Sequence, residues 1–214
     1  MKLDRACFAS TSLLIQCVNL DGAGAGSELA RARVAVLTRL VALHGDLNTE
    51  PAHDMTRAVC SALAAARVSH VSWLRVVTSL SDDIFLRQPD LLVSGHHWAM
   101  VQAGLVSEDG LTRKRSMFLL KRTLDTVTSD LGRVEDGSGL VSGDKSSARE
   151  NFDNYFLVLE TLEEKQVHLV RQVVAKIQQL LHLSTQAGGA RFHPSWILIL
   201  FLRVFRHPNI AIVR

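Results

Sequence analysis

The sequence has few of the residues that build disulfide-rich, zinc-binding or sheet-dominated proteins. Its 214 residues include three cysteines, Cys7, Cys17 and Cys60, and no Cys-x-x-Cys pair. Three cysteines are too few for a disulfide framework, and the missing pair excludes a zinc ribbon or finger. Aromatic residues make up 6% and proline occupies only four positions. Because hydrophobic residues reach 47%, mostly Leu, Val and Ala, we expect a helical protein with a substantial core.

Acidic residues are absent from the C-terminal part of the chain. All 21 lie before position 166, and from Gln166 to Arg214 there are six basic residues: Arg171, Lys176, Arg191, Arg203, Arg206 and Arg214. A one-sided positive charge can attract a polyanion such as nucleic acid. The alternative is a solvated face whose acidic counterpart lies in a neighbouring segment. The sequence leaves both interpretations open.

Long apolar runs are missing as well. The most apolar window, residues 196–202, ends after seven residues at Arg203, whereas a membrane span needs ~20. We therefore predict a buried core helix there. Near the N-terminus, Asp4 and several polar residues up to Gln16 interrupt the apolar pattern, which favours an amphipathic helix over a signal peptide. We expect an intracellular protein, in the cytoplasm or the nucleus, with no membrane partner.

A glycine-rich run at residues 22–26, within VNLDGAGAGSELARAR, has the composition of a nucleotide-binding loop. A Rossmann-like methyltransferase loop needs a strand, an acidic residue, alternating glycines and then a helix. Here Asp21 directly precedes Gly22, where one residue usually intervenes, and nothing downstream alternates strand and helix. We interpret the run as a flexible joint between two helices, and we expect no cofactor in this chain.

Helical periodicity extends through nearly the whole chain, and no segment has the pattern of a strand. We expect helices at about 3–20, 27–45, 49–80 with a break near Ser69, 96–106, 111–131, 154–183 with a break near 163–166, and 194–206. The polar residues near Ser81 and Pro89 mark a further boundary, and segments 132–150 and 184–192 are predicted loops.

Helix pairs in series predict an all-α fold, an α-solenoid of HEAT- or armadillo-like repeats. The repeats would cover residues 1–131 and 151–214, separated by the flexible loop 132–150. Because the helix WILILFLRVF is followed by no polar cap, we expect the chain to be a fragment truncated at its C-terminus.

The segment LTRKRSMFLLKR, residues 111–122, is the clearest candidate for a binding surface. At ~100° per residue, Lys114 and Lys121 share one stripe of a helix and Arg115 and Arg122 share another. Phe118 lies between them, and we call these side chains the basic ridge. Such a ridge can neutralise phosphates, with Phe118 packing or stacking on a base. The alternative is an ordinary solvated face.

The remaining face of the same helix is apolar. Met117, Leu120, Leu124 and Val127 recur at helical spacing, so we expect them to pack into the core.

No arrangement of side chains supports a catalytic or metal site. His96 and His97 are adjacent, point to different sides of a helix and have no HExxH motif nearby, so we expect core or surface histidines. Glu160, Glu163 and Glu164 fit an acidic helix end better than general acid–base catalysis. No Ser/His/Asp or Cys/His spacing supports a nucleophile.

Three stretches resemble the helical-repeat region of a known family. RKRSMFLLKR, ETLEEKQVHLVR and HPSW lie in that order within 104–122, 154–177 and 192–214. They resemble the large eukaryotic tRNA guanosine ribose 2′-O-methyltransferases of the TAR RNA-binding-protein type. Residues 1–95 carry no matching motif. In this family a long α-solenoid precedes a SPOUT catalytic domain that binds S-adenosylmethionine and methylates a tRNA ribose.

The resemblance implies a non-catalytic arm that is inactive alone. Its partners would be tRNA and the catalytic domain of the full-length protein, and S-adenosylmethionine would bind to that domain. The alternative is a protein–protein interaction scaffold without RNA binding.

Overall fold

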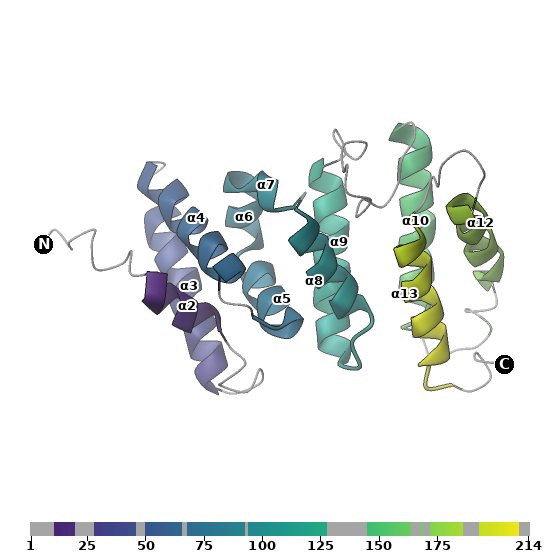
Figure 1. Cartoon of the computed structure of the whole chain (residues 1–214), viewed down its shortest axis with the longest axis horizontal. Coiled ribbons are helices and arrows are strands. Elements are labelled where there is room, and N and C mark those ends of the chain that lie inside the picture. The colour runs from purple at the N-terminus through teal and green to yellow at the C-terminus, as the bar shows by residue number, and fades with distance from the viewer. Residues whose placement is uncertain are drawn as a thin grey trace, which may run out of the picture. The chain divides into compact units, whose positions relative to one another are not determined.

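The computed structural model describes residues 11–19, 28–45, 50–65, 68–92, 94–127, 145–163, 168, 172–185 and 193–209 (Figure 1). Within these ranges the regular secondary structure is helical and no strand occurs. The prediction of an all-α protein is therefore confirmed for the described residues. The glycine run 22–26 and most of the expected loop 132–150 lie outside them.

The helices follow one another along the whole described chain. They are α2 (Thr11–Val18), α3 (Glu28–Gly45), α4 (Glu50–Ala65), α5 (His70–Ser79), α6 (Ser81–Arg87), α7 (Pro89–Leu92), α8 (Gly95–Leu105), α9 (Gly110–Val127), α10 (Lys145–Thr161), α12 (Val174–Thr185) and α13 (Pro194–Phe205).

Local signals in the sequence explain several of these boundaries. The Ser69 hydroxyl caps α5 by accepting a hydrogen bond of 3.3 Å from the backbone N–H of Ser72. The expected break near Ser69 is thereby confirmed. α3 ends at Gly45, and α13 begins at Pro194, whose missing N–H costs nothing in a first turn.

One expected boundary is confirmed and another differs. Leu80 separates α5 from α6, and Gln88 separates α6 from α7, so the polar residues near Ser81 and Pro89 do mark helix boundaries. The short helix α6 itself was not expected, and its Ser81, Ile84 and Phe85 are buried. α10 begins at Lys145, so the last residues of the expected loop 132–150 are helical.

The chain divides into two compact units. Unit 1 comprises Met1–Gly104 with Asp109–Leu119, and unit 2 comprises Leu105–Glu108 with Leu120–Arg214. In unit 1, α4 packs on α2, α3 and α6, and α3 also packs on α5 (Figure 1). In unit 2, α12 packs on both α10 and α13. Within each unit, these helices pack on others that are near them in the sequence.

The core of unit 1 contains a cluster of tryptophan and histidine rings. The His97 ring lies edge-on to Trp73 at 5.3 Å and to Trp98 at 5.5 Å between centroids. His97 is completely buried whereas His96 is exposed, in line with our interpretation of the pair as core and surface residues. Burial lowers the pKa of His97 to about 3, so its imidazole is neutral at physiological pH.

Gly104 allows a close approach of three helices in unit 1. A Cβ built on Gly104 of α8 would lie 2.0 Å from Ser116 Oγ of α9 and 2.3 Å from Leu74 Cδ1 of α5. The three helices therefore meet at a point where only a hydrogen atom fits.

The core of unit 2 is built around α10 and α13. The rings of Tyr155 and Trp196 are perpendicular with centroids 5.7 Å apart, and the Tyr155 hydroxyl donates a 3.1 Å hydrogen bond to the Trp196 carbonyl. The apolar window 196–202 is buried at Trp196, Ile197, Ile199 and Leu200. However, Leu198 and Phe201 are exposed, so the prediction of a buried helix holds for one face only. No helix among the described residues is long and apolar enough to cross a membrane.

Candidate nucleic-acid interface

The helix that carries the basic ridge begins at an aspartate cap. Asp109 Oδ2 accepts hydrogen bonds from the Thr112 backbone N–H at 2.7 Å and from its hydroxyl at 2.5 Å. These bonds lower the pKa of the Asp109 carboxyl, so it is ionised at neutral pH. The negative charge lies at the N-terminus of α9, where the helix dipole favours it.

Three members of the basic ridge form the exposed face of α9. Lys114 and Lys121 are exposed, and Phe118 between them is 43% exposed. At ~100° per residue these side chains fall within an arc of about 60°. The helical spacing thus places an aromatic ring between two cations, as the sequence predicted.

The expected core-facing side of α9 is confirmed for two of its four residues. Leu120 and Leu124 are buried. Met117 is only half-buried, and the side chain of Val127 lies outside the described residues. The apolar residues therefore anchor α9 and leave the lysines directed outward.

The two arginines of the ridge differ from the lysines. Arg115 and Arg122 are half-buried, about 100° around the helix from Lys114 and Lys121. Burial lowers the pKa of Arg115, and the positive charge of Arg75 on α5 lowers it further, while Asp109 opposes this effect. The basic ridge is therefore an exposed strip of two lysines and a phenylalanine, bordered by half-buried arginines.

Lys121 has an aromatic contact in unit 2. Its ammonium lies 5.4 Å from the centroid of the half-buried Phe156 ring of α10. Phe156 in turn lies 5.8 Å from Phe152, measured between ring centroids. A cation over an aromatic face is attracted by the ring quadrupole. Lys121 therefore combines an exposed charge with a packing role that its sequence position did not indicate.

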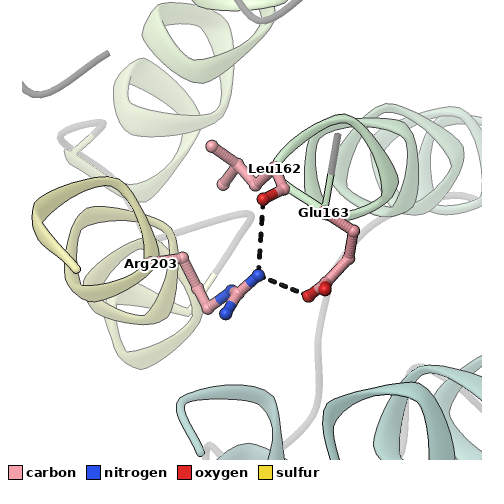
Figure 2. Close-up of polar contacts among 3 residues, drawn as sticks. All are labelled: Leu162, Glu163 and Arg203. Carbon is pink, nitrogen blue, oxygen red and sulfur yellow. Dashed lines mark hydrogen bonds and ion pairs between the residues drawn. The ribbon is translucent and has the colours of Figure 1, made fainter. Parts of the chain in front are cut away.

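One cation of the acid-free C-terminal part has an acidic partner. Arg203 of α13 forms an ion pair with Glu163, which follows α10, and its Nη2 lies 3.5 Å from the Leu162 carbonyl (Figure 2). Both side chains are largely shielded from solvent. For Arg203, this ion pair supports the alternative interpretation of the acid-free region, in which the acidic counterpart lies in a neighbouring segment. Glu163 has a structural role there, as we expected for the acidic helix end.

Two further C-terminal cations also have partners inside unit 2. Lys176 Nζ donates to Asn154 Oδ1 at 2.5 Å, and Arg206 Nη1 donates to the Val106 carbonyl at 3.0 Å. Arg171, Arg191 and Arg214 lie outside the described residues. The described part of the basic C-terminal region is therefore used in folding, which leaves α9 as the stronger candidate for a polyanion.

The described residues include no cluster of metal ligands, and of their two free cysteines Cys60 is buried and Cys17 half-buried. Among the described residues, no group of three or more His, Cys, Asp and Glu side chains could hold a metal ion. Cys60 is buried, and its burial raises the pKa of the thiol to about 12. A protonated, shielded thiol is a poor nucleophile.

Comparison with known proteins gives one similarity. No protein-family model matches the chain, and no solved structure matches it. The curated relative that it matches is far longer, and the chain spans only 8% of that relative's length. Over 133 residues, which cover 56% of this chain, it is 33% identical to the tRNA (guanosine(18)-2'-O)-methyltransferase TARBP1 of Mus musculus.

Proposed function

We propose that the chain is a non-catalytic segment of a tRNA guanosine 2′-O-ribose methyltransferase, and that it contributes to tRNA binding through the basic ridge. The similarity to the mouse enzyme supports the tRNA-related role. The exposed strip of Lys114, Phe118 and Lys121 on α9 carries the binding function. S-adenosylmethionine would bind to a SPOUT catalytic domain outside this chain, in an intracellular protein. That catalytic domain would be the second partner of the segment.

The proposed architecture is an α-solenoid of HEAT- or armadillo-like helix pairs. The packing of α4 on α2 and α3, and of α12 on α10 and α13, supports it because these contacts join helices that are near in sequence. Such repeats present one extended face for a partner, and the exposed face of α9 fits that role.

The two lysines suit the recognition of a nucleic-acid backbone. Seven residues along a helix separate Lys114 from Lys121 by roughly 10 Å, so each ammonium can contact a different phosphate. The Phe118 ring between them can pack against a base or a ribose. Because phosphate contacts release counterions, the binding is expected to weaken steeply with added salt.

Charge reversal at the ridge tests this proposal. The double variant Lys114→Glu/Lys121→Glu is expected to bind tRNA at least about tenfold more weakly near 0.1 M salt, since two phosphate contacts become repulsive. Affinity is measured by gel shift with the full chain. The matched control is Arg31→Glu/Arg39→Glu on α3, where both side chains are exposed. If both double variants weaken tRNA binding equally, the effect is one of overall charge. If the α9 double variant does not weaken binding, the basic ridge is not the tRNA-binding surface.

The single variant Lys114→Glu separates binding from folding. Reversal at Lys121 also removes its contact with Phe156, whereas the exposed Lys114 has no such ring contact in the described structure. Loss of tRNA binding by Lys114→Glu with an unchanged circular dichroism spectrum would therefore assign the loss to the interface.

A second candidate function is a protein-interaction scaffold, which an apolar stripe on α13 favours. Leu198, Phe201 and Phe205 recur at helical spacing, and Leu198 and Phe205 are 58% and 67% exposed. Exposed apolar stripes of this kind dock protein helices.

This second function makes a different prediction. It expects the wild-type chain to bind no tRNA in the gel shift, and a co-purified protein partner to dissociate from the variant Leu198→Asp/Phe205→Asp. The matched control is Leu86→Asp on α6, an equally drastic change at an exposed leucine. If the α13 variant still retains the protein partner, this apolar stripe is not the docking site.

A further inference from the structure

Lys121 of α9 lies over an aromatic ring of unit 2. Its ammonium is 5.4 Å from the centroid of the Phe156 ring on α10. Phe156 is itself held in place, because its ring packs on Phe152 with centroids 5.8 Å apart and Phe152 is almost completely buried. A half-buried ring that a buried neighbour fixes therefore gives the exposed lysine a preferred position.

A ring contact orients a lysine without using up its hydrogen-bond donors. Three other cations of unit 2, Arg203, Lys176 and Arg206, each donate to an oxygen atom of the protein. The Phe156 ring instead attracts the Lys121 ammonium through its quadrupole and leaves the positive charge in place. Lys121 is therefore positioned by the protein and can still direct its N–H donors at an anion.

The position of a lysine before binding matters because the side chain has much conformational freedom. A lysine loses rotamer freedom when it contacts a phosphate, and this loss opposes binding. Preorganisation of the side chain removes part of that loss. Lys114, the other lysine of the exposed strip, has no such ring contact in the described structure. The two lysines therefore differ in how far they are ordered before RNA binds.

We propose that Phe156 is a positioning residue of the RNA interface, which holds the Lys121 ammonium ready for one backbone phosphate. This inference rests on the proposed tRNA-binding function and adds α10 to the helices that build the interface. Phe156 acts through Lys121 and does not need to contact the RNA itself. Loss of the ring should therefore reduce the affinity while the number of phosphate contacts stays the same.

Replacement of the ring tests this role. Phe156→Leu keeps an apolar side chain, removes the quadrupole, and is expected to weaken tRNA binding about threefold. The slope of log Kd against log salt should stay unchanged, because Lys121 still reaches its phosphate. Lys121→Gln loses that phosphate contact, so the slope should fall by about one. Affinity is measured by fluorescence anisotropy with labelled tRNA and the full chain.

A double-mutant cycle shows whether Phe156 acts through Lys121. Phe156→Leu should have no further effect in the Lys121→Gln background, but should still weaken binding about threefold in the Lys114→Gln background. Leu157→Ala, which shortens the exposed side chain next to Phe156 on α10, is the matched control and should leave binding unchanged. An equal loss of affinity in both lysine backgrounds would make Phe156 a purely structural residue and overturn the inference.

A ring of nearly unchanged shape guards against misfolding. Pentafluorophenylalanine at position 156 fills nearly the same space, but its fluorine atoms withdraw negative charge from the ring face. It should weaken tRNA binding as much as Phe156→Leu does, whereas Phe156→Tyr keeps the ring and should bind with wild-type affinity. Wild-type affinity of the fluorinated protein would contradict the cation–ring contact as the cause.

The outcomes separate this inference from the function on which it rests. If wild type binds tRNA but either the Phe156 variants or Lys121→Gln leave the affinity unchanged, the positioning role is wrong. The proposed tRNA binding itself fails only if wild type binds no tRNA, and then both are wrong. A loss of affinity in the Phe156 variants that disappears in the Lys121→Gln background supports both.

Discussion

Substitution of Gly104 by alanine is expected to lower the free energy of unfolding by about 2–3 kcal/mol, as overpacking of a well-packed core does. The added methyl group would meet Ser116 Oγ at 2.0 Å, Leu74 Cδ1 at 2.3 Å and Ser116 Cβ at 3.2 Å. The leucine methyl can swing away at a cost. The Ser116 Cβ is fixed by the backbone of α9, so α8 itself must shift. Urea denaturation of the full chain, monitored by tryptophan fluorescence, measures the loss.

A second glycine provides the matched control. A Cβ on Gly110 would meet only Arg113 Nη2, at 3.5 Å, which is an ordinary contact with the end of a flexible side chain. Gly110→Ala is therefore expected to be neutral or to stabilise the protein by up to about 1 kcal/mol through helix propensity. Equal stability of Gly104→Ala and wild type would show that the helices meet less closely than described. Adding Ser116→Ala to Gly104→Ala should recover part of the loss, because it removes the nearest atom.

The stability of the protein is expected to fall by about 2 kcal/mol between pH 7 and pH 5 because of His97 alone. The unfolded imidazole titrates near 6.5, whereas burial lowers its pKa in the folded protein to about 3. Well above pH 7 both states have lost this proton, so His97 contributes no pH dependence there. Between these two values the unfolded state binds a proton that the folded state does not, and the free energy of unfolding decreases as the pH falls.

The contribution of His97 is measured as a difference between variants. His97→Leu fills the same core position without a titrating group, so its stability should depend less on pH than that of wild type by about 2 kcal/mol over this range. His96→Gln, at the exposed neighbouring position, is the control and should keep the wild-type dependence. Denaturant titrations at both pH values give the free energies of unfolding of the three proteins. Parallel pH profiles of wild type and His97→Leu would contradict the buried, neutral state of the ring.

Much of the fold could be predicted because its signals are local. Ser69, Gly45 and Pro194 act through their own backbone and side-chain chemistry, so the sequence located the start or end of three helices. The boundary at Ser81 was predicted, but the short helix α6 that follows it was missed for a tertiary reason. The buried Ile84 and Phe85 hold this segment in a helix. Burial of two apolar side chains outweighs the weak helix preference of the neighbouring polar residues.

In the candidate site, too, local features could be predicted from the sequence and long-range contacts could not. Arithmetic at ~100° per residue was sufficient to place Lys114, Phe118 and Lys121 on one exposed face. It could not reveal the close approach of Leu74 and Ser116 at Gly104, because these residues lie far apart in the sequence and meet only in the folded chain. Nor could it reveal the ring of Phe156 beneath Lys121, since no helical period connects α9 with α10.

The buried Tyr155, which packs on Trp196, gives the protein an intrinsic optical reporter. Tyr155 is the only tyrosine in the sequence, and it is completely buried in unit 2. Its burial raises the pKa of the phenol well above the ordinary value. At a pH near the ordinary phenol value of about 10, tyrosinate absorbance can therefore arise only from chains in which unit 2 has opened. A single absorbance signal thus follows the unfolding of unit 2 without any added label.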